Sequence, residues 1–391
     1  MIMETNNKYI IKIIATWMID ELIVFSKHTK VDIILLQKQE EFFNEGLERL
    51  KIKNLKTYTK PFSTKHLLKK LGVVIPFFFK NLFRFRIDYN MVIGLNAIFT
   101  FLKLDLSLFS KESNIHAQFA SQSAIISLLI KKYYRNEPKY SFTFHAYDIY
   151  FESKWFSKLV EQCHKAFSIS EFNINYVTNK YLSSKKIVLA RLGVFTEEMK
   201  PFNKEKDEVL TLGIMSWFVK KKGVEYLLEA LNILKEKGYF NVKLILAGDG
   251  PLKEKYLKYI NKKKLESFVD YIGSVDGKTK INFYNSLDVF ILPSISLPND
   301  QDGIPVVLME SIAYGLPIIS TDVSGIPEIC INKYNGFLLE EKNTNEIVNS
   351  IISLIENREQ LDNFSKNSLE LSKKYDIEIN SKEKMKAMGW I

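Results

Sequence analysis

The chain has 391 residues, more than one hydrophobic core usually holds, so two domains are expected. Its two cysteines, Cys163 and Cys330, form no metal or redox spacing, and its longest apolar runs, about nine residues, fall short of the ~20 that a transmembrane helix needs. The sequence shows no signal-peptide pattern, so a reducing, cytoplasmic setting is expected.

The net charge of +10 belongs to the first half of the chain. Residues 1–200 hold 30 Lys and Arg against 18 Asp and Glu, whereas residues 201–391 hold 25 against 27. The stretch Lys51–Ile87 alone holds ten basic residues and no acid, mixed with bulky apolar residues. That mixture suits an anionic membrane surface, where each cation can contribute ~1 kcal/mol. A solvated basic face over a core helix is the alternative, and nucleic acid is not expected because no recognition motif accompanies the charge.

Short apolar runs alternate with longer helical patterns in residues 1–200, which is typical of a parallel sheet flanked by helices. Gln122–Tyr134 has such a helical pattern. The predicted strands are Ile10–Thr16, Val31–Leu36, Asn114–Gln118, Tyr140–Phe144, Ala166–Ile169 and Ile187–Leu189.

A polar, proline-bearing stretch, Met199–Glu208, is the predicted linker between domains of residues 1–200 and 201–374. A second α/β series follows it, with amphipathic helices at 224–237 and 341–356. Its predicted strands are Leu210–Met215, Lys243–Ala247, Val269–Ile272, Val289–Leu292, Ile318–Ser320 and Gly336–Leu339. We therefore expect two Rossmann-like α/β domains facing across a cleft, with ligands at the carboxyl ends of the strands.

The segment 302–328 is the most informative in the chain, and its first part predicts a phosphate site. Asp302 is followed by Gly303, Ile304 and Pro305, and Glu310 comes eight positions after Asp302. We expect a helix that starts at Ile304, so that backbone N–H groups near Gly303 and Ile304 are free to bind an anion. Gly303 would let a ligand approach the backbone, and Pro305 suits a helix start because it needs no N–H donor there.

The two acids would then act on different parts of one ligand. Asp302 would lie beside the anion, and Glu310, on the inward face of the helix, would accept hydrogen bonds from neighbouring hydroxyls such as those of a ribose. The alternative is that Asp302 is a helix N-cap and Glu310 a surface acid. The glycine and proline positions between them favour the ligand site.

This segment resembles the Glu-x7-Glu signature of the family 4 retaining glycosyltransferases, which have the two-domain GT-B fold. Further similar stretches follow that family's order through residues 209–340: Leu210–Gly223, Leu246–Leu252, Tyr271–Val275 and Leu287–Ser294. The first half resembles the family more weakly, at Ile115–Ala120, Phe144–Asp148 and Phe167–Phe172. The C-terminal residues 375–391 have the position of the family's helix that packs back on the first domain.

The resemblance implies that a hexose-type sugar is moved from a nucleotide-diphosphate donor, with retention at the anomeric carbon and no metal or other cofactor. It assigns Glu310 to the ribose and Asp302 to the donor sugar. His145, the second catalytic candidate, would contact the sugar near the reacting carbon. The other donor-binding candidates are Lys221 and Lys222 at the diphosphate, Gly303, Ile304 and Pro305 at the helix start, and Gly273 and Ser274 beside the base.

The chemistry of the reaction agrees with these residue types. Breaking the bond to the diphosphate places negative charge on the leaving oxygen and positive charge on the sugar. A lysine and a helix N-terminus suit the first, and a carboxylate with a neutral imidazole suits the second. No second carboxylate for a glycosidase-type nucleophile and acid pair is evident, so a front-face mechanism is the expectation.

Three departures from the family pattern stand out. The first acid of the signature is Asp302 rather than Glu, and Trp217 stands where the family usually has an arginine on the diphosphate. Lys220 or Lys221 could supply the missing charge. The family's N-terminal glycine-rich loop is replaced by Ala15–Glu21, which leaves the acceptor side undefined. Asp300-Gln301-Asp302 is formally the metal motif of another glycosyltransferase fold, but its place before this helix favours no metal.

We therefore expect a cytoplasmic glycosyltransferase, peripheral on the inner face of the membrane, that extends a surface polysaccharide or a lipid-linked glycan. A UDP-sugar donor is mildly favoured. A catalytically weak homologue that binds nucleotide sugar or glycan without turnover is the alternative, motivated by Trp217 and Asp302. A basic membrane scaffold would explain the first half of the chain and leave residues 302–328 unexplained.

Overall fold

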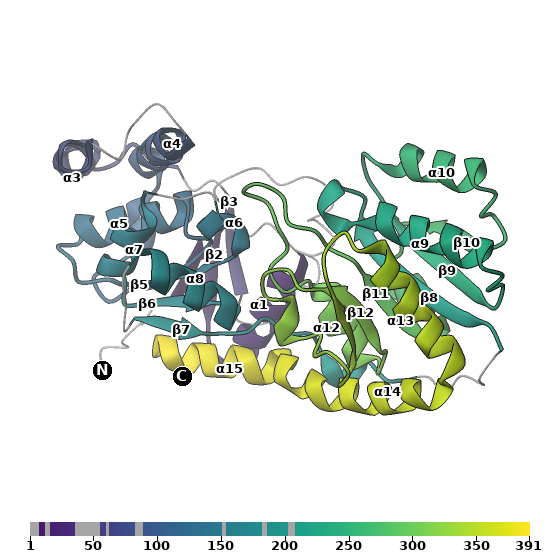
Figure 1. The fold of residues 1–391 in the computed structure, drawn as a ribbon. Coiled ribbons are helices and arrows are strands. Elements are labelled where there is room, and N and C mark those ends of the chain that lie inside the picture. The colour runs from purple at the N-terminus through teal and green to yellow at the C-terminus, as the bar shows by residue number, and fades with distance from the viewer. Residues whose placement is uncertain are drawn as a thin grey trace. The chain divides into compact units, whose positions relative to one another are not determined.

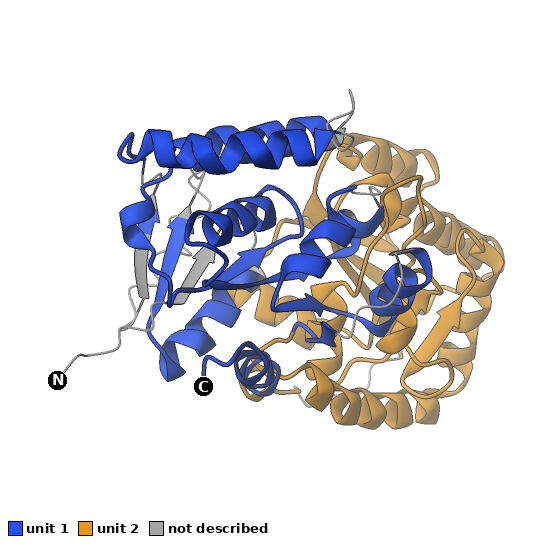
Figure 2. Cartoon of the chain, turned by 90° about the vertical axis from the view of Figure 1, so that its left-hand side faces the viewer, with its two compact units in different colours: residues 1–192, 377–391 blue, residues 193–376 orange. Residues whose placement is uncertain are grey.

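The computed structural model in Figure 1 describes residues 8–11, 16–35, 55–59, 62–82, 89–150, 154–181, 186–201 and 208–391. The chain divides into two compact units, coloured in Figure 2: unit 1 is Met1–Leu192 with Ile377–Ile391, and unit 2 is Gly193–Asp376. The change of unit comes before residue 200, because Val194 already pairs with Asp376 and its amide donates to Tyr375 O. Residues 202–207 of the predicted linker lie outside the described residues.

Unit 1 is built on a seven-stranded parallel sheet of order β3-β2-β1-β4-β5-β6-β7. The strands are β1 (Lys8–Ile11), β2 (Val31–Leu35), β3 (Leu55–Thr59), β4 (Asn114–Gln118), β5 (Lys139–Phe144), β6 (Lys165–Ser168) and β7 (Ile187–Leu189). The helices are α1 (Thr16–His28), α3 (Leu67–Lys80), α4 (Tyr89–Lys103), α5 (Gln122–Tyr133), α6 (Ala146–Tyr150), α7 (Phe156–Gln162), α8 (Glu171–Tyr181) and α15 (Ile377–Met388).

Two strands of unit 1 differ from the sequence prediction by more than one residue at an end. β1 ends at Ile11 and α1 begins at Thr16, where a strand to Thr16 was expected. β3, which was not predicted, lies inside the basic stretch 51–87. It is the edge strand of the sheet, and edge strands carry polar and charged residues that hide the apolar pattern of a buried strand. Part of the basic stretch therefore belongs to the sheet.

Helices cover both faces of the unit 1 sheet. One core lies between β4 and β5 and the helices α3, α4, α5 and α7; Figure 1 shows α3 and α4 outside α5. The other lies between β2 and β6 and the helices α1 and α15. Ile34 belongs to the first core and Ile33 to the second, as the alternation of a strand requires.

Unit 2 is built on a six-stranded parallel sheet of order β10-β9-β8-β11-β12-β13. Its strands are β8 (Leu210–Trp217), β9 (Val242–Asp249), β10 (Val269–Gly273), β11 (Val289–Leu292), β12 (Ile318–Thr321) and β13 (Gly336–Leu339). Its α-helices are α9 (Val224–Glu236), α10 (Lys253–Lys262), α11 (Gly277–Ser286), α12 (Val306–Ala313), α13 (Thr344–Glu356) and α14 (Arg358–Ser372).

The two parallel α/β sheets confirm the predicted fold class of both halves. In unit 2 the chain runs outward from β8 to β10 and then returns to place β11 beside β8. Such a reversal of strand order opens a crevice at the carboxyl ends of the two central strands, where α/β proteins bind ligands. The described helices include none with both the length and the apolar character needed to span a bilayer.

Candidate functional site

The loops that follow β8 and β11 meet where the strand order of unit 2 reverses. The first contains the 3-10 turn η4 (Lys220–Lys222), and the second runs from Pro293 to Pro305. The amide of Ile295 donates to the carbonyl oxygen of Lys221 over 2.8 Å. Gly223 has φ of 63°, and a Cβ there would lie 1.9 Å from the carbonyl oxygen of Pro293. Glycine is therefore required for the two loops to dock.

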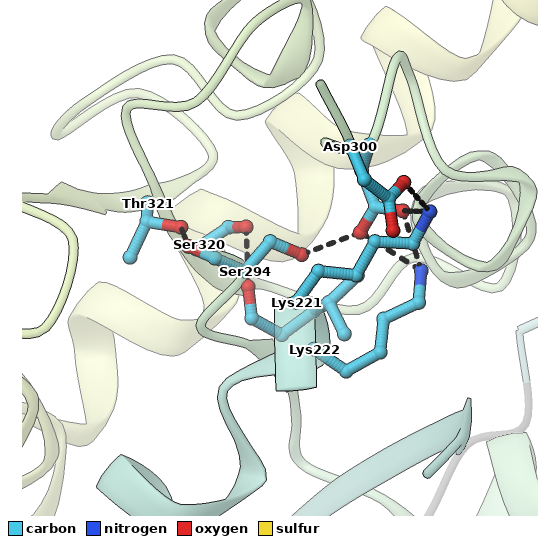
Figure 3. A network of polar contacts seen from close by, with 8 residues as sticks. Lys221, Lys222, Ser294, Asp300, Ser320 and Thr321 are labelled. Atoms are coloured by element: carbon cyan, nitrogen blue, oxygen red, sulfur yellow. Dashed lines mark hydrogen bonds and ion pairs between the residues drawn. The ribbon is translucent and has the colours of Figure 1, made fainter. Parts of the chain in front are cut away.

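Docking brings two of the predicted donor-site residues into an ion pair. Lys222 Nζ lies 2.8 Å from both carboxylate oxygens of Asp302, and the Ser294 hydroxyl donates to Asp302 Oδ2 over 2.7 Å. Lys221 Nζ donates to Asp300 Oδ1 over 2.7 Å and lies 3.9 Å from Asp302 (Figure 3). Lysines therefore face both acids of the formal Asp-x-Asp motif.

The charge of Asp302 is stabilised by these neighbours. Burial of the carboxyl opposes its ionisation, but the ammonium groups of Lys222 and Lys221 and the Ser294 hydroxyl outweigh burial and hold the pKa of Asp302 below its usual value. A diphosphate bound at Lys222 would share that cation with Asp302. The ion pair therefore joins Lys222, which is predicted to bind the leaving diphosphate, to Asp302, which is predicted to bind the donor sugar.

The end of β12 holds the loop after β11 in place. The Ser320 hydroxyl donates to the carbonyl oxygen of Leu292 over 2.6 Å, and the Thr321 hydroxyl donates to that of Ser294 (Figure 3). Sequence reasoning missed Ser294, Ser320 and Thr321. The only sequence feature that could have indicated them is that hydroxyl residues stand at the ends of two apolar strands, β11 and β12.

The helix after Asp302 starts later than predicted. α12 begins at Val306, and Gly303 and Ile304 lie in a bend before it. The reason is Pro305, because the residue before a proline is disfavoured in the helical region. The free N–H donors of the first helical turn therefore belong to Val306 and Val307, and the predicted helix start at Ile304 is wrong. That the backbone of Gly303 and Ile304, just before the helix, binds the donor stays a prediction.

Glu310 lies in α12 with its side chain only 8% exposed. The Tyr284 hydroxyl donates to its Oε2 over 2.7 Å, and the Lys280 ammonium contacts its Oε1. Burial and the charge of Glu310 raise the pKa of Tyr284, which keeps this phenol a hydrogen-bond donor. Lys280 and Tyr284 were not predicted; their signal is a spacing of four residues, which places both on one face of α11.

Gly273 and Ser274 lie at the carboxyl end of β10, the edge strand of the unit 2 sheet. Gly273 has φ of 72°, a left-handed turn that glycine adopts readily. The chain then enters α11 through a capping box of Asp276 and Thr279. This turn therefore leads into the helix whose Lys280 and Tyr284 hold Glu310.

His145 belongs to unit 1, at the carboxyl end of β5. Its backbone amide donates to Asp148 Oδ2 over 2.9 Å, and its ring lies 4.9 Å from that of Phe119, a residue with φ of 73°. Burial and the charge of Lys384 lower the pKa of His145 to about 3, so the imidazole is neutral near pH 7. His116 is a core residue whose ring nitrogens pair with the hydroxyls of Ser141 and Thr143.

Trp217, in the place expected of an arginine, ends β8 with 62% of its surface exposed. Of the segment Ala15–Glu21, which replaces the family's glycine-rich loop, Ala15 lies outside the described residues and the rest begins helix α1. Glu21 is buried, with its Oε1 2.7 Å from Lys384 Nζ. No group of three or more His, Cys, Asp or Glu side chains in the described part of the chain is placed to hold a metal ion.

Residues 195–370 match the sequence profile described as Glycosyl transferases group 1. Among curated proteins, an uncharacterised glycosyltransferase of Methanocaldococcus jannaschii is 34% identical over 41% of this chain and 42% of its own length. The amylovoran biosynthesis glycosyltransferase AmsK of Erwinia amylovora is 34% identical over 40% of this chain and 39% of its own. The chain thus spans about two fifths of the length of these relatives.

Solved structures share the fold of the chain, and two of them illustrate the likeness. Anabaena HepE in complex with UDP has a TM-score of 0.71 at 14% identity, covering 98% of this chain and 100% of that one. A glycosyltransferase from Rickettsia africae has a TM-score of 0.70 at 16% identity, covering 98% of each chain. At such identities the likeness shows the fold alone, and that fold is GT-B.

Proposed function

Since residues 195–370 match the profile of the group 1 glycosyl transferases, we propose that the chain is a retaining glycosyltransferase that moves a hexose from a nucleotide-diphosphate sugar. The observation that carries the proposal is the cluster at the reversal of unit 2, where two lysines and the buried carboxylate of Asp302 meet between the ends of β8 and β11. Such a cluster can stabilise a diphosphate leaving group and the developing positive charge of a sugar.

In this proposal each residue has one task. Lys222 and Lys221 take up the charge of the leaving diphosphate, together with the first N–H groups of α12. Glu310, already a hydrogen-bond acceptor for Tyr284, accepts from the ribose hydroxyls. His145, neutral near pH 7, contacts the sugar near the reacting carbon. The leaving phosphate itself takes the acceptor proton, and no metal takes part, since lysines face both carboxylates of the Asp-x-Asp motif.

We propose a UDP-sugar as donor and a glycan or lipid-linked glycan as acceptor. The donor is supported by the shared fold with HepE, which was crystallised with UDP and with UDP-glucose. The acceptor is supported by relatives whose names concern amylovoran and capsular polysaccharide biosynthesis. The reaction would then serve the synthesis of a surface polysaccharide.

We further propose that the protein works in the cytoplasm, on the inner face of the membrane. Nearly half of the exposed large apolar side chains among the described residues lie between positions 62 and 99, on and beside α3 and α4. They are Phe62, Leu67, Leu68, Ile75, Phe79, Leu82, Val92 and Phe99. Exposed apolar side chains among cations suit insertion at a lipid interface.

One residue of the basic stretch does not belong to that surface. Lys70 is buried, and its ammonium donates to the carbonyl oxygens of Ser63, Leu102 and Leu104. It fastens α3 to the end of α4 and is a structural lysine. Lys51, Lys53, Lys60, Arg84 and Arg86 of the stretch lie outside the described residues.

A thermal-shift screen of nucleoside diphosphates and nucleotide sugars tests the donor proposal, since a ligand at about 100 times its Kd adds ~2.7 kcal/mol. We expect Glu310→Ala to lose the shift, His145→Ala to keep it and lose sugar transfer, and Glu266→Ala, an exposed acid in unit 2, to keep both. No shift with any donor would contradict the proposal.

The second candidate is a homologue that binds a nucleotide sugar without turnover. It is favoured by Trp217 in the place of an arginine and by the pairing of Lys222 with Asp302. A wild-type protein that shows the shift, but neither transfers nor slowly hydrolyses any donor, would establish this candidate.

A further inference from the structure

A surface pocket of unit 1 lies between α3, α5 and α7, apart from every residue assigned above to the sugar donor. Its volume is about 330 Å³. The last two turns of α3 form one wall, and the C-terminal end of α5 and both ends of the short helix α7 contribute the others. Its apolar floor includes Phe77, which is buried and stacks on Trp155 with ring centroids 5.7 Å apart.

Three lysines line this pocket: Lys80 of α3, Lys132 of α5 and Lys158 of α7. Within the described residues, none of the three ammonium groups has a hydrogen bond or ion-pair partner. Burial and the charges of Lys158 and Lys80 lower the pKa of Lys132, as expected of cations that share a confined space.

Two neighbouring lysines of the same unit, unlike the three that line the pocket, have hydrogen-bond partners. Lys131 donates to the carbonyl oxygen of Gln162, and Lys186 donates to those of Glu161 and Cys163. Those lysines satisfy carbonyl groups near the end of α7. The carbonyl groups at this end are thus satisfied without the pocket lysines. Three cations without a described protein partner therefore line a hollow that can accept an anion.

The outer side of α3 indicates what kind of anion fits. Ile75 and Phe79 of α3 are 51% and 68% exposed, and Leu82, just after the helix, is 53% exposed. Phe79 is adjacent to the pocket residue Lys80. A free phosphate would gain nothing from these side chains. An anion that carries acyl chains would place its charge in the pocket and its apolar part along α3.

We propose that this pocket binds the phosphate-bearing headgroup of an anionic membrane phospholipid, whose acyl chains lie beside the exposed apolar side chains of α3. The inference rests on the proposed membrane association and gives it a specific site. It does not depend on the donor site of unit 2.

The first experiment uses dihexanoyl-phosphatidylglycerol below its micelle concentration, which presents the headgroup without a membrane. We expect this lipid to raise the Tm of the wild-type protein, and inorganic phosphate at the same concentration to leave it unchanged. The variant Lys80→Gln/Lys132→Gln/Lys158→Gln should lose the rise. The variant Lys65→Gln/Lys69→Gln/Lys103→Gln removes the same charge outside the pocket, from just before α3, from its first turn and from the end of α4, and should keep the rise.

The second experiment separates a pocket from a patch of charge. No atom lies within 4 Å of a Cβ built on Gly72, which lines the pocket. Gly72→Ala should therefore bind phosphatidylglycerol vesicles like the wild type. Gly72→Gln keeps every charge and has room to extend into the pocket, so it should bind these vesicles at least about tenfold more weakly.

Several outcomes overturn the inference. No Tm rise of the wild type with the short-chain lipid removes the pocket as a lipid site, and an equal rise with inorganic phosphate reassigns it to free phosphate. If the two triple variants lose the lipid-induced Tm rise equally, the lipid binds through the overall positive charge and not through the pocket. The nucleoside diphosphate shift, measured on the same samples, should survive in the pocket variants. If the wild type shows a Tm rise with the lipid but none with nucleoside diphosphates, the donor proposal is refuted and the lipid pocket is still supported.

Discussion

Asp302 is buried, and burial alone would favour its neutral form, but its lysine and serine neighbours favour the charged form. The pKa of the Asp302 carboxyl is lower in the folded protein than in the unfolded protein, where it is about 3.9. The carboxylate therefore stabilises the fold above the unfolded pKa, and this stabilisation is lost as the pH falls through the folded pKa. We therefore expect Asp302→Asn to lower the free energy of unfolding by about 1–3 kcal/mol near neutral pH. The difference from the wild type should shrink below about pH 4. Urea unfolding across this range measures it.

Asp300→Asn is the control, because Asp300 pairs with Lys221 at the surface with its side chain 49% exposed. Surface pairs contribute about 0–1 kcal/mol, so this variant should stay near the wild type. An Asp302→Asn deficit that is the same in acid as at neutral pH would show that the carboxylate charge is not what stabilises the loop.

Trp217 allows the missing arginine to be restored. The side chain is 62% exposed at the end of β8, so a guanidinium fits without repacking the core. We expect Trp217→Arg to bind nucleoside diphosphate about tenfold more tightly, worth ~1.4 kcal/mol, since charge-assisted hydrogen bonds to phosphate are strong. Calorimetric titration measures the Kd, with Trp217→Leu as control. An unchanged Kd, together with loss of binding in Lys222→Met, would mean that the lysines already replace the arginine.

The residue types of this site could be predicted from the sequence, but their partners could not. Asp302 and Glu310 are conspicuous because glycine and proline punctuate the chain between them. Lys222 pairs with Asp302 because two loops approach one another in the folded unit, and Tyr284 and Lys280 hold Glu310 because helices α11 and α12 do. Spacing along the chain does not encode that approach.

At the scale of elements, the loop after β8 is fixed by close contact with the loop after β11. Gly223 is left-handed, and a Cβ there would collide with the backbone of Pro293. Gly238 is left-handed too, but a Cβ there would meet no atom within 4 Å. We expect Gly238→Ala to lose about 1–2 kcal/mol of stability from the backbone conformation alone. Gly223→Ala should lose more and should also weaken nucleotide binding, because it displaces Lys221 and Lys222.

Chemical denaturation and the nucleotide thermal shift, measured on both variants, test this view of the loop. Equal destabilisation with unchanged nucleotide binding in both would show that the loop adapts and that docking on Pro293 does not position the lysines.

Element boundaries show where sequence reasoning fails and why. Buried central strands such as β4 and β11 were predicted at their observed bounds, because apolar runs mark them. The edge strand β3 was missed, and the start of α12 was placed too early because the restriction that Pro305 imposes on Ile304 was overlooked. In α3, Lys70 looked like a surface cation because no local pattern reveals the three carbonyl groups it serves.

At the scale of the whole molecule, the last helix of the chain completes the first unit. α15 packs on α1, and Lys384 Nζ lies 2.7 Å from Glu21 Oε1 with both side chains at least 90% buried. Gln118 donates to the other oxygen of Glu21 over 2.9 Å. Removing one partner of such a pair leaves a buried charge, so Lys384→Met should cost roughly 3–5 kcal/mol of stability. Lys386→Met, on the exposed side of the same helix, should cost little.

Lys384 also acts on the candidate catalytic residue of unit 1. Burial is the larger cause of the low pKa of His145, about 3, and the charge of Lys384 adds to it. We therefore expect Lys384→Met to raise the pKa of His145 while leaving it below the ordinary value near 6.5, because the burial remains. An NMR titration of the histidine ring protons measures this shift, with Lys386→Met as control. An unchanged His145 pKa in folded Lys384→Met would mean that the C-terminal helix supports unit 1 by packing alone and does not tune its imidazole.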